Sequence, residues 1–178
     1  DRIKLIYHPT PWRGLSVLLG AMQLIKNPNI TLDVYSSTKI YGTEFESKNE
    51  NNYKALYDQA RELPNVNYIG YKSNDYILEN LHHYDAFVYP NIWEETFCIS
   101  ALEALACGLY VATTDHGCLY ETCSEFPIYV PYNDDYRELA KQFASVIDGI
   151  PLQINKLGLH IHLKFQQNFY RNFYNWKV

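Results

Sequence analysis

The residues best suited to chemistry are two carboxylates, Glu95 and Glu103, and an arginine–glycine pair, Arg13 and Gly14. Glu95 lies in a polar corner, and Glu103 lies eight residues later in a run of good helix formers. Because carboxylates are seldom buried without a partner, Glu103 is either solvated on the outer face of a helix or an acceptor that faces a ligand. Arg13 can hold two phosphate oxygens, and Gly14 permits close backbone approach at a helix N-terminus, where anions are favoured. Such a pair is also common in ordinary loops.

A strand, a loop and a helix must position the two carboxylates. The strand over residues 86–89 ends at Pro90, and the helix begins near Cys98 and is closed by Gly108. Helical spacing predicts an apolar stripe on this helix, formed by Ile99, Leu102, Leu105 and Ala106.

A second unit of the same kind positions Arg13. It consists of a strand over residues 3–8, a turn-rich loop over 9–14 and a helix over 15–25. In α/β sheets, ligands bind at the carboxyl ends of strands, which is where both loops are expected. The polar tract over residues 37–52 predicts a surface loop or insertion.

Further strands and helices alternate along the rest of the chain. We predict strands over 31–36, 66–69, 110–114 and 128–130, and helices over 53–62, 75–84 and 136–147. Six strands alternating with helices indicate an α/β fold, a doubly wound, Rossmann-like, parallel six-stranded sheet flanked by helices, with strand order 3-2-1-4-5-6.

Two regions are expected in the chain. Residues 1–150 form the Rossmann-like domain, and residues 151–178 form a helical C-terminal segment. Helical spacing in this segment predicts an apolar face, which must be covered by other parts of the protein. The face consists of Phe165, Phe169, Phe173 and Trp176.

Composition argues against several classes of protein. A formal net charge of -5 with scattered cationic residues disfavours nucleic acid as a partner. The chain contains no run of about eighteen apolar residues, so the sequence does not predict a membrane span. The four cysteines form no Cys-x2-Cys pair, which favours reduced thiols and a cytoplasmic protein.

The triplet 133–135, Asn-Asp-Asp, precedes a helix, so an N-terminal cap explains it without a metal. Because the chain starts at Asp1, we expect a fragment of a longer protein.

The spacing Glu-x7-Glu, followed by Ala-Leu-Ala-Cys-Gly and the strand over 110–114, resembles the donor-sugar signature of retaining glycosyltransferases of the GT-B fold. The group is glycosyltransferase family 4, or group 1, and the segment Arg13-Gly14-Leu15 resembles its diphosphate-binding segment. The resemblance covers about residues 7–147 and implies the C-terminal donor-binding domain of an enzyme that transfers a hexosyl group from a UDP or GDP sugar. The acceptor is an unknown glycan, lipid or protein. The enzyme's N-terminal domain would be absent, the C-terminal segment would pack on it, and this fragment would be inactive alone.

Carried onto this sequence, the resemblance implies a role for each matching residue. Glu95 and Arg13 take part in catalysis, with Arg13 offsetting diphosphate charge and Glu95 holding sugar hydroxyls. Glu103 takes the ribose hydroxyls. No metal ion or other cofactor is required. The donor-binding residues implied are Gly14, Tyr71, Lys72, Thr96, Phe97, Cys98, Ile99, Ser100 and Glu103.

Alternatives remain open at this point. A non-catalytic nucleotide-binding or interaction module of the same fold is one, because Thr96 and Cys98 replace the glycines usual at those positions in the resembled family. The segment around Tyr71 and Lys72 could equally be an ordinary loop with a helix cap at Ser73 or Asn74. A dinucleotide-dependent dehydrogenase is disfavoured, since no Gly-x-Gly-x-x-Gly follows the first strand.

Overall fold

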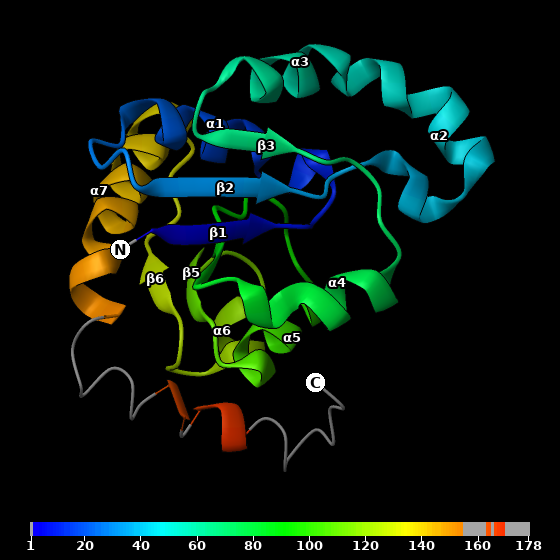
Figure 1. Cartoon of the computed structure of the whole chain (residues 1–178). Helices are drawn as coiled ribbons and strands as arrows, with labels where there is room; N and C mark the ends of the chain where they lie inside the picture. The colour runs from blue at the N-terminus through cyan, green and yellow to red at the C-terminus, as the bar shows by residue number, and fades with distance from the viewer. Residues whose placement is uncertain (1, 155–162, 165, 170–178) are drawn as a thin grey trace.

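The fold is a six-stranded parallel sheet in the order β3-β2-β1-β4-β5-β6, which confirms the predicted architecture (Figure 1). The computed structural model describes residues 2–154, 163–164 and 166–169. The strands are β1 (Ile3–Tyr7), β2 (Ile30–Val34), β3 (Val66–Tyr68), β4 (Ala86–Tyr89), β5 (Tyr110–Thr114) and β6 (Ile128–Val130).

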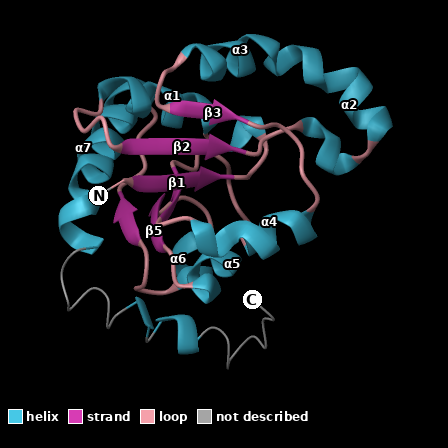
Figure 2. Cartoon of the chain, viewed as in Figure 1, coloured by secondary structure: helices cyan, strands magenta, loops and turns pink. Residues whose placement is uncertain are grey.

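The centre of the sheet is the core of the molecule. Every residue of β4 and β5 is buried, as is usual for parallel strands covered on both faces. β1 pairs with β4 through Leu5 and Ala86, and Ala86 in turn pairs with Tyr110 of β5. Figure 2 shows the strands enclosed by helices, and all of the paired strands are parallel. Their carboxyl ends therefore lie at one edge.

Helices pack on the sheet in two groups. α1 (Leu15–Leu24) packs against α3 (Lys54–Glu62) and α7 (Tyr136–Ile154), while α5 (Ile99–Cys107) packs against α6 (Leu119–Cys123). Right-handed crossovers on either side of β1 place these groups on opposite faces. Figure 1 shows α1 and α7 together, apart from α5, α6 and α4 (Asn74–Asn80).

The tract over residues 37–52, expected to be a surface loop or insertion, lies mostly at the surface but is helical, so the loop part of that prediction was wrong. It forms η2 (Thr38–Tyr41), α2 (Thr43–Asn49) and η3 (Glu50–Tyr53), where η marks a 3-10 helix. α2 buries none of its residues, so it carries no apolar stripe that periodicity could detect. Its helical signal is in its charges, because Glu44 lies in the first turn and accepts a 2.7 Å hydrogen bond from Lys48 one turn later.

The last helix of the domain is longer than predicted. α7 was expected to end at Ile147 but continues through Pro151 to Ile154, so the predicted boundary after residue 150 falls inside it. Beyond it, Gln166 is buried and donates to the carbonyl oxygens of Leu105 and Leu109 at 3.0 and 3.1 Å. The first of these bonds reaches a carbonyl in the last turn of α5, and the second reaches the residue just before β5.

Most of the predicted aromatic face lies outside the described residues. Of its four members, Phe169 alone is described; its ring centroid lies 5.6 Å from that of Phe126. The packing of this segment on a further domain stays a prediction.

Candidate functional site

Two strand–loop–helix units meet at the carboxyl edge of the sheet. η1 (Pro11–Arg13) connects β1 to α1, and the loop over residues 90–98 connects β4 to α5. Because β1 and β4 are neighbours from which the chain winds in opposite directions, the loops flank the crevice where open α/β sheets bind ligands. The amide of Ile92 donates to the carbonyl of Arg13 at 3.2 Å and joins the loops directly.

Two glycines allow the backbones around this crevice to approach each other. Gly14 has a φ of 136°, and a Cβ there would lie 2.1 Å from the carbonyl oxygen of Pro90. Gly117 has a φ of 68°, and its Cβ would lie 2.5 Å from the backbone nitrogen of Glu95. The amide of Cys118 also donates to the carbonyl of Glu95 at 2.9 Å. The loop that carries Glu95 is therefore held from both sides.

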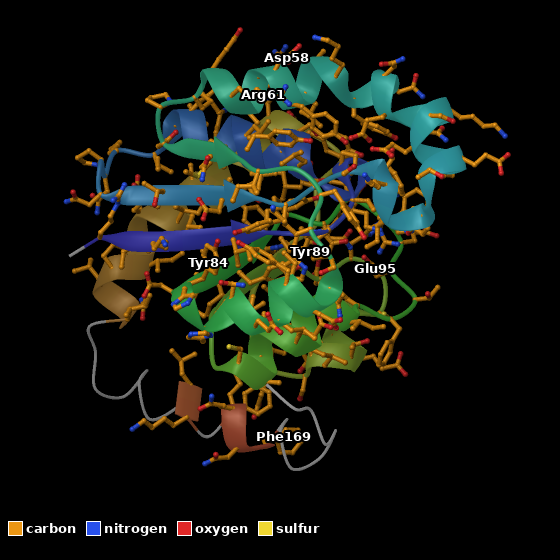
Figure 3. The ribbon with its side chains drawn as sticks, turned by 45° about the vertical axis from the view of Figure 1, so that its right-hand side comes forward. Asp58, Arg61, Tyr84, Tyr89, Glu95 and Phe169 are labelled. Atoms are coloured by element: carbon orange, nitrogen blue, oxygen red, sulfur yellow. The ribbon has the colours of Figure 1, made fainter. Side chains whose placement is uncertain are left out.

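Glu95 is a buried carboxylate, 6% exposed, with two partners. Its Oε1 atom accepts from Arg13 Nη1 and from Tyr89 Oη, each at 2.5 Å. Figure 3 shows Tyr89 and Glu95 close together beside the sheet. Burial opposes the charge of Arg13, but the hydrogen bond and charge of Glu95 outweigh it and raise the pKa of Arg13. Among the described residues Oε2 makes no hydrogen bond, so it can accept from a ligand.

A pocket of about 210 Å³, here called the central pocket, opens beside this pair. Helix α5 begins at this pocket, and its first amide, at Ile99, lacks an acceptor within the helix. With Arg13 this helix N-terminus makes the pocket suited to an anion. Its lining residues are His8, Pro9, Thr10, Arg13, Ile40, Tyr41, Glu95, Phe97, Cys98, Ile99 and Ser100.

His8 and Thr10 are pocket residues that sequence reasoning missed. His8 Nε2 and Thr10 Oγ1 are buried polar atoms without a hydrogen-bond partner among the described residues. Burial lowers the pKa of His8 from 6.5 to about 4, so its imidazole is neutral at pH 7. Unpaired buried polar atoms are costly, so both atoms have hydrogen-bonding capacity to offer a ligand or a water molecule at the central pocket. Their position just after the carboxyl end of β1 is the sequence feature that could have indicated them. Tyr89, the last residue of β4, was also missed.

Glu103 is buried, 2% exposed, which excludes the solvated alternative. It accepts a 3.3 Å hydrogen bond from Asn74 Nδ2, and burial raises its pKa. α5 is buried all round from Ala101 to Ala106, so the predicted single stripe was wrong. Ile99, which was placed on that stripe, is 51% exposed because it starts the helix at the rim of the central pocket.

The remaining predicted donor residues lie outside the central pocket. Thr96 is exposed and does not line it. Tyr71 is exposed with Lys39 Nζ 5.5 Å from its ring centroid, and Lys72 Nζ lies 5.2 Å from the ring of Tyr76. Ser73 caps α4 by accepting from Tyr76 N at 3.3 Å, so the helix-cap interpretation holds for this loop. The structure thus brings Arg13, Glu95 and residues 97–100 together, with Tyr71 and Lys72 apart.

In the described part of the chain, no group of three or more His, Cys, Asp and Glu side chains is placed to hold a metal ion. Asp135 caps α7, since its Oδ1 accepts from the amides of Arg137 and Glu138 at 3.0 and 3.2 Å. Over the same residues, no helix has the length and apolar character needed to cross a bilayer. The absence of a metal requirement stays a prediction.

Comparison with protein families identifies the class. Residues 8–166 match the model of the family described as glycosyl transferases group 1. The chain therefore belongs to the group 1 glycosyltransferases, a family that the fold and the Glu-x7-Glu spacing also indicate. A search of curated protein sequences found no match.

Solved structures of glycosyltransferases share the fold. HepE of Anabaena in complex with UDP-glucose superposes with a TM-score of 0.69 and 16% identity, over 97% of this chain and 44% of that one. The catalytic domain of a cholesterol-α-glucosyltransferase from Helicobacter pylori gives 0.68 and 20%, over 97% and 99%. The pneumococcal O-GlcNAc transferase GtfA, with UDP and GlcNAc, gives 0.65 and 16%, over 96% and 32%. The chain thus spans less than half of HepE and about a third of GtfA.

Proposed function

We propose that this chain is the donor-binding domain of a retaining glycosyltransferase that transfers a hexosyl group from a nucleotide diphosphate sugar. The observation that carries the proposal is the partly buried Arg13–Glu95 pair beside the N-terminus of α5. A cation and a positive helix end suit a diphosphate, and the free Oε2 of Glu95 suits a sugar hydroxyl. Support also comes from the solved relatives HepE and GtfA, which hold UDP or a UDP sugar.

The chemistry asked of this domain is the stabilisation of a leaving group. In the transfer, an acceptor hydroxyl oxygen bonds to the anomeric carbon, and the bond from that carbon to the diphosphate breaks. The electron pair stays on the nucleoside diphosphate, and the acceptor's proton passes to the diphosphate or to water. Arg13 and the amide at Ile99 face the charge that develops, as preorganised donors should. The neutral His8 and the Thr10 hydroxyl add hydrogen bonds without adding charge.

Glu103 is proposed to hold the ribose. Among the described residues its carboxylate has one side-chain hydrogen bond, from Asn74, which leaves acceptor capacity for two ribose hydroxyls. Asn74 follows the loop of Tyr71 and Lys72, where the base would lie. The complete enzyme would use a companion N-terminal domain for its acceptor, since the relatives that the chain matches are mostly longer.

The second candidate, a non-catalytic module, depended on Thr96 and Cys98. Thr96 lies outside the central pocket and so blocks nothing within it. Cys98 lines the pocket but is 4% exposed, with burial raising its pKa, so its thiol sits mainly in the core. These positions favour donor binding over a blocked site.

Calorimetric titration of UDP, GDP and their nucleosides tests the proposal. Arg13→Ala should weaken the diphosphate at least about tenfold and the nucleoside little, since the lost contact is with phosphate charge. Arg13→Lys keeps the charge but not the two-pronged geometry and should fall between. Arg137→Ala, an exposed arginine on α7, is the control. Equal weakening of diphosphate and nucleoside would show that Arg13 is purely structural, and no nucleotide binding by wild type would overturn the proposed function.

A further inference from the structure

A buried tyrosine, Tyr89, contacts the Arg13–Glu95 pair but does not itself line the central pocket. It is the last residue of β4, and its hydroxyl donates to Glu95 Oε1 at 2.5 Å. Burial raises the pKa of Tyr89, so the hydroxyl keeps its proton at pH 7 and acts as the donor in this bond. Tyr89 can therefore influence a ligand in the pocket only through Glu95.

The ion pair that Tyr89 contacts is joined at a single point. Arg13 reaches Glu95 through Nη1 and meets only the Oε1 atom. Arginine and carboxylate frequently pair through two parallel hydrogen bonds, which use two nitrogens and both oxygens. Here Oε1 accepts from Arg13 and from Tyr89, and Oε2 accepts from neither of them. The pair is therefore held in an open, one-pronged form.

The position of the Tyr89 hydroxyl is fixed by aromatic packing. Its ring centroid lies 6.2 Å from that of Tyr7, in an edge-on contact, and 5.8 Å from that of Phe87. All three rings are fully buried, and Tyr7 is tied down by a 2.9 Å hydrogen bond from its hydroxyl to the carbonyl of Thr10. Close-packed rings of this kind do not turn freely. The sheet thus presents a rigid donor to the loop that carries Glu95 (Figure 3).

Without the hydroxyl, the pair would close. The buried carboxylate of Glu95 would lose one of its two donors, and a second N–H of Arg13 is the donor at hand to replace it. Two-pronged pairing would then occupy Oε2, the acceptor left for a sugar hydroxyl, and an N–H of Arg13 that could otherwise meet a phosphate oxygen. Closure would hide both groups from a ligand.

We propose that Tyr89 is a positioning residue, whose hydroxyl holds the Arg13–Glu95 pair open for the nucleotide diphosphate sugar. The inference rests on the proposed function of the central pocket, because an open pair matters only if both of its partners bind the donor. The ring of Tyr89 fills the core, and the hydroxyl alone has the positioning role.

Tyr89→Phe separates these two roles, because phenylalanine keeps the ring and removes the hydroxyl. In a crystal structure of the ligand-free variant, Arg13 should contact both oxygens of Glu95. Calorimetric titration with UDP should show affinity about tenfold below wild type, the size expected for one weakened contact to a charged group.

Tyr84→Phe is the matched control. Tyr84 is also buried, 8% exposed, and its hydroxyl donates to the carboxylate of Asp33 at 2.7 Å. It lies just before the start of β4, whereas Tyr89 ends that strand, and Figure 3 shows the two tyrosines at separate places along the sheet. Both variants lose the same kind of hydrogen bond, so both should melt below wild type. The affinity for UDP should fall in Tyr89→Phe alone.

A double-mutant cycle with Glu95→Gln tests whether Tyr89 acts through Glu95. An amide has only one acceptor oxygen and cannot form the two-pronged pair. Adding Tyr89→Phe to Glu95→Gln should therefore weaken UDP by less than about twofold further, in place of about tenfold. A hydroxyl that merely supports the fold would cost the same in both backgrounds.

The outcomes separate this inference from the proposed function. A one-pronged Arg13–Glu95 pair in the Tyr89→Phe structure, or wild-type affinity of this variant for UDP, overturns the positioning role. The same follows if the tenfold loss persists in the Glu95→Gln background or appears in Tyr84→Phe. Failure of the wild-type chain to bind any nucleotide contradicts the proposed function instead, and the crystal structure still decides whether Tyr89 holds the pair open.

Discussion

Replacing Glu103 by glutamine should strengthen the fold and weaken nucleotide binding. The wild-type carboxylate is 2% exposed, and its hydrogen bond from Asn74 is 3.3 Å long, so the structure compensates the burial of its charge poorly. Glutamine keeps the acceptor for Asn74 and removes the charge. The expected gain at pH 7 is about 1 kcal/mol, or a rise in Tm of about 2–4 °C.

The pH dependence of this gain follows from the pKa of Glu103. Burial raises that pKa above the ordinary value of 4.5. The unfolded chain therefore releases this proton more readily, so wild-type stability falls as pH rises from 4.5 through the folded pKa and then stays level. Below about pH 4 both side chains are neutral, and the two melting curves should converge. Above the folded pKa the variant should keep its full advantage.

The affinity of the Glu103→Gln variant for UDP should fall, although its stability rises. Losing a charge-assisted acceptor for ribose hydroxyls costs about 1.5–3 kcal/mol, which weakens UDP about 10- to 150-fold. Thermal melting from pH 4 to 8 and calorimetric titration with UDP measure the two effects. Glu79→Gln, an exposed carboxylate on α4, is the control and should change neither. A Glu103→Gln variant that melts below wild type at pH 7, or binds UDP equally well, refutes the reasoning.

Two further predictions concern backbone approach and Glu50, which accepts hydrogen bonds that anchor the tract over residues 37–52. Gly14→Ala should destabilise the chain by several kcal/mol, about 3 or more, because its Cβ would lie 2.1 Å from the Pro90 oxygen at a φ of 136°. Gly149→Ala, in α7 with open space around it, should instead stabilise by about 0.5–1 kcal/mol, and urea unfolding compares them. Burial opposes the charge of Glu50, but hydrogen bonds from its neighbours lower its pKa, so stability is lost as pH falls through that lowered pKa. Glu50→Gln should remove this acid dependence from the melting curves and reduce stability at pH 7; an unchanged acid slope would contradict the anchoring role.

Within the site, local signals and the family resemblance together singled out Arg13 and residues 97–100, and the structure places these residues at the central pocket. Their roles in donor binding stay predictions. His8, Thr10 and Tyr89 were not found, because their position at a strand end is shared by many residues without a functional role. Their role depends on which atoms the fold leaves unpaired around them.

The sequence by itself determined the order of the elements and the doubly wound sheet, because alternating periodicities and the glycines and prolines between them act over a few residues. Only the tertiary structure decided that Arg13 pairs with Glu95, 82 residues away, and that Glu103 is buried. It also decided that the charged tract over residues 37–52 packs aromatic side chains against Trp12. Side-chain pairing and burial depend on which segments, distant in the sequence, come into contact. Packing of the helices and strands across the whole sheet decides those contacts.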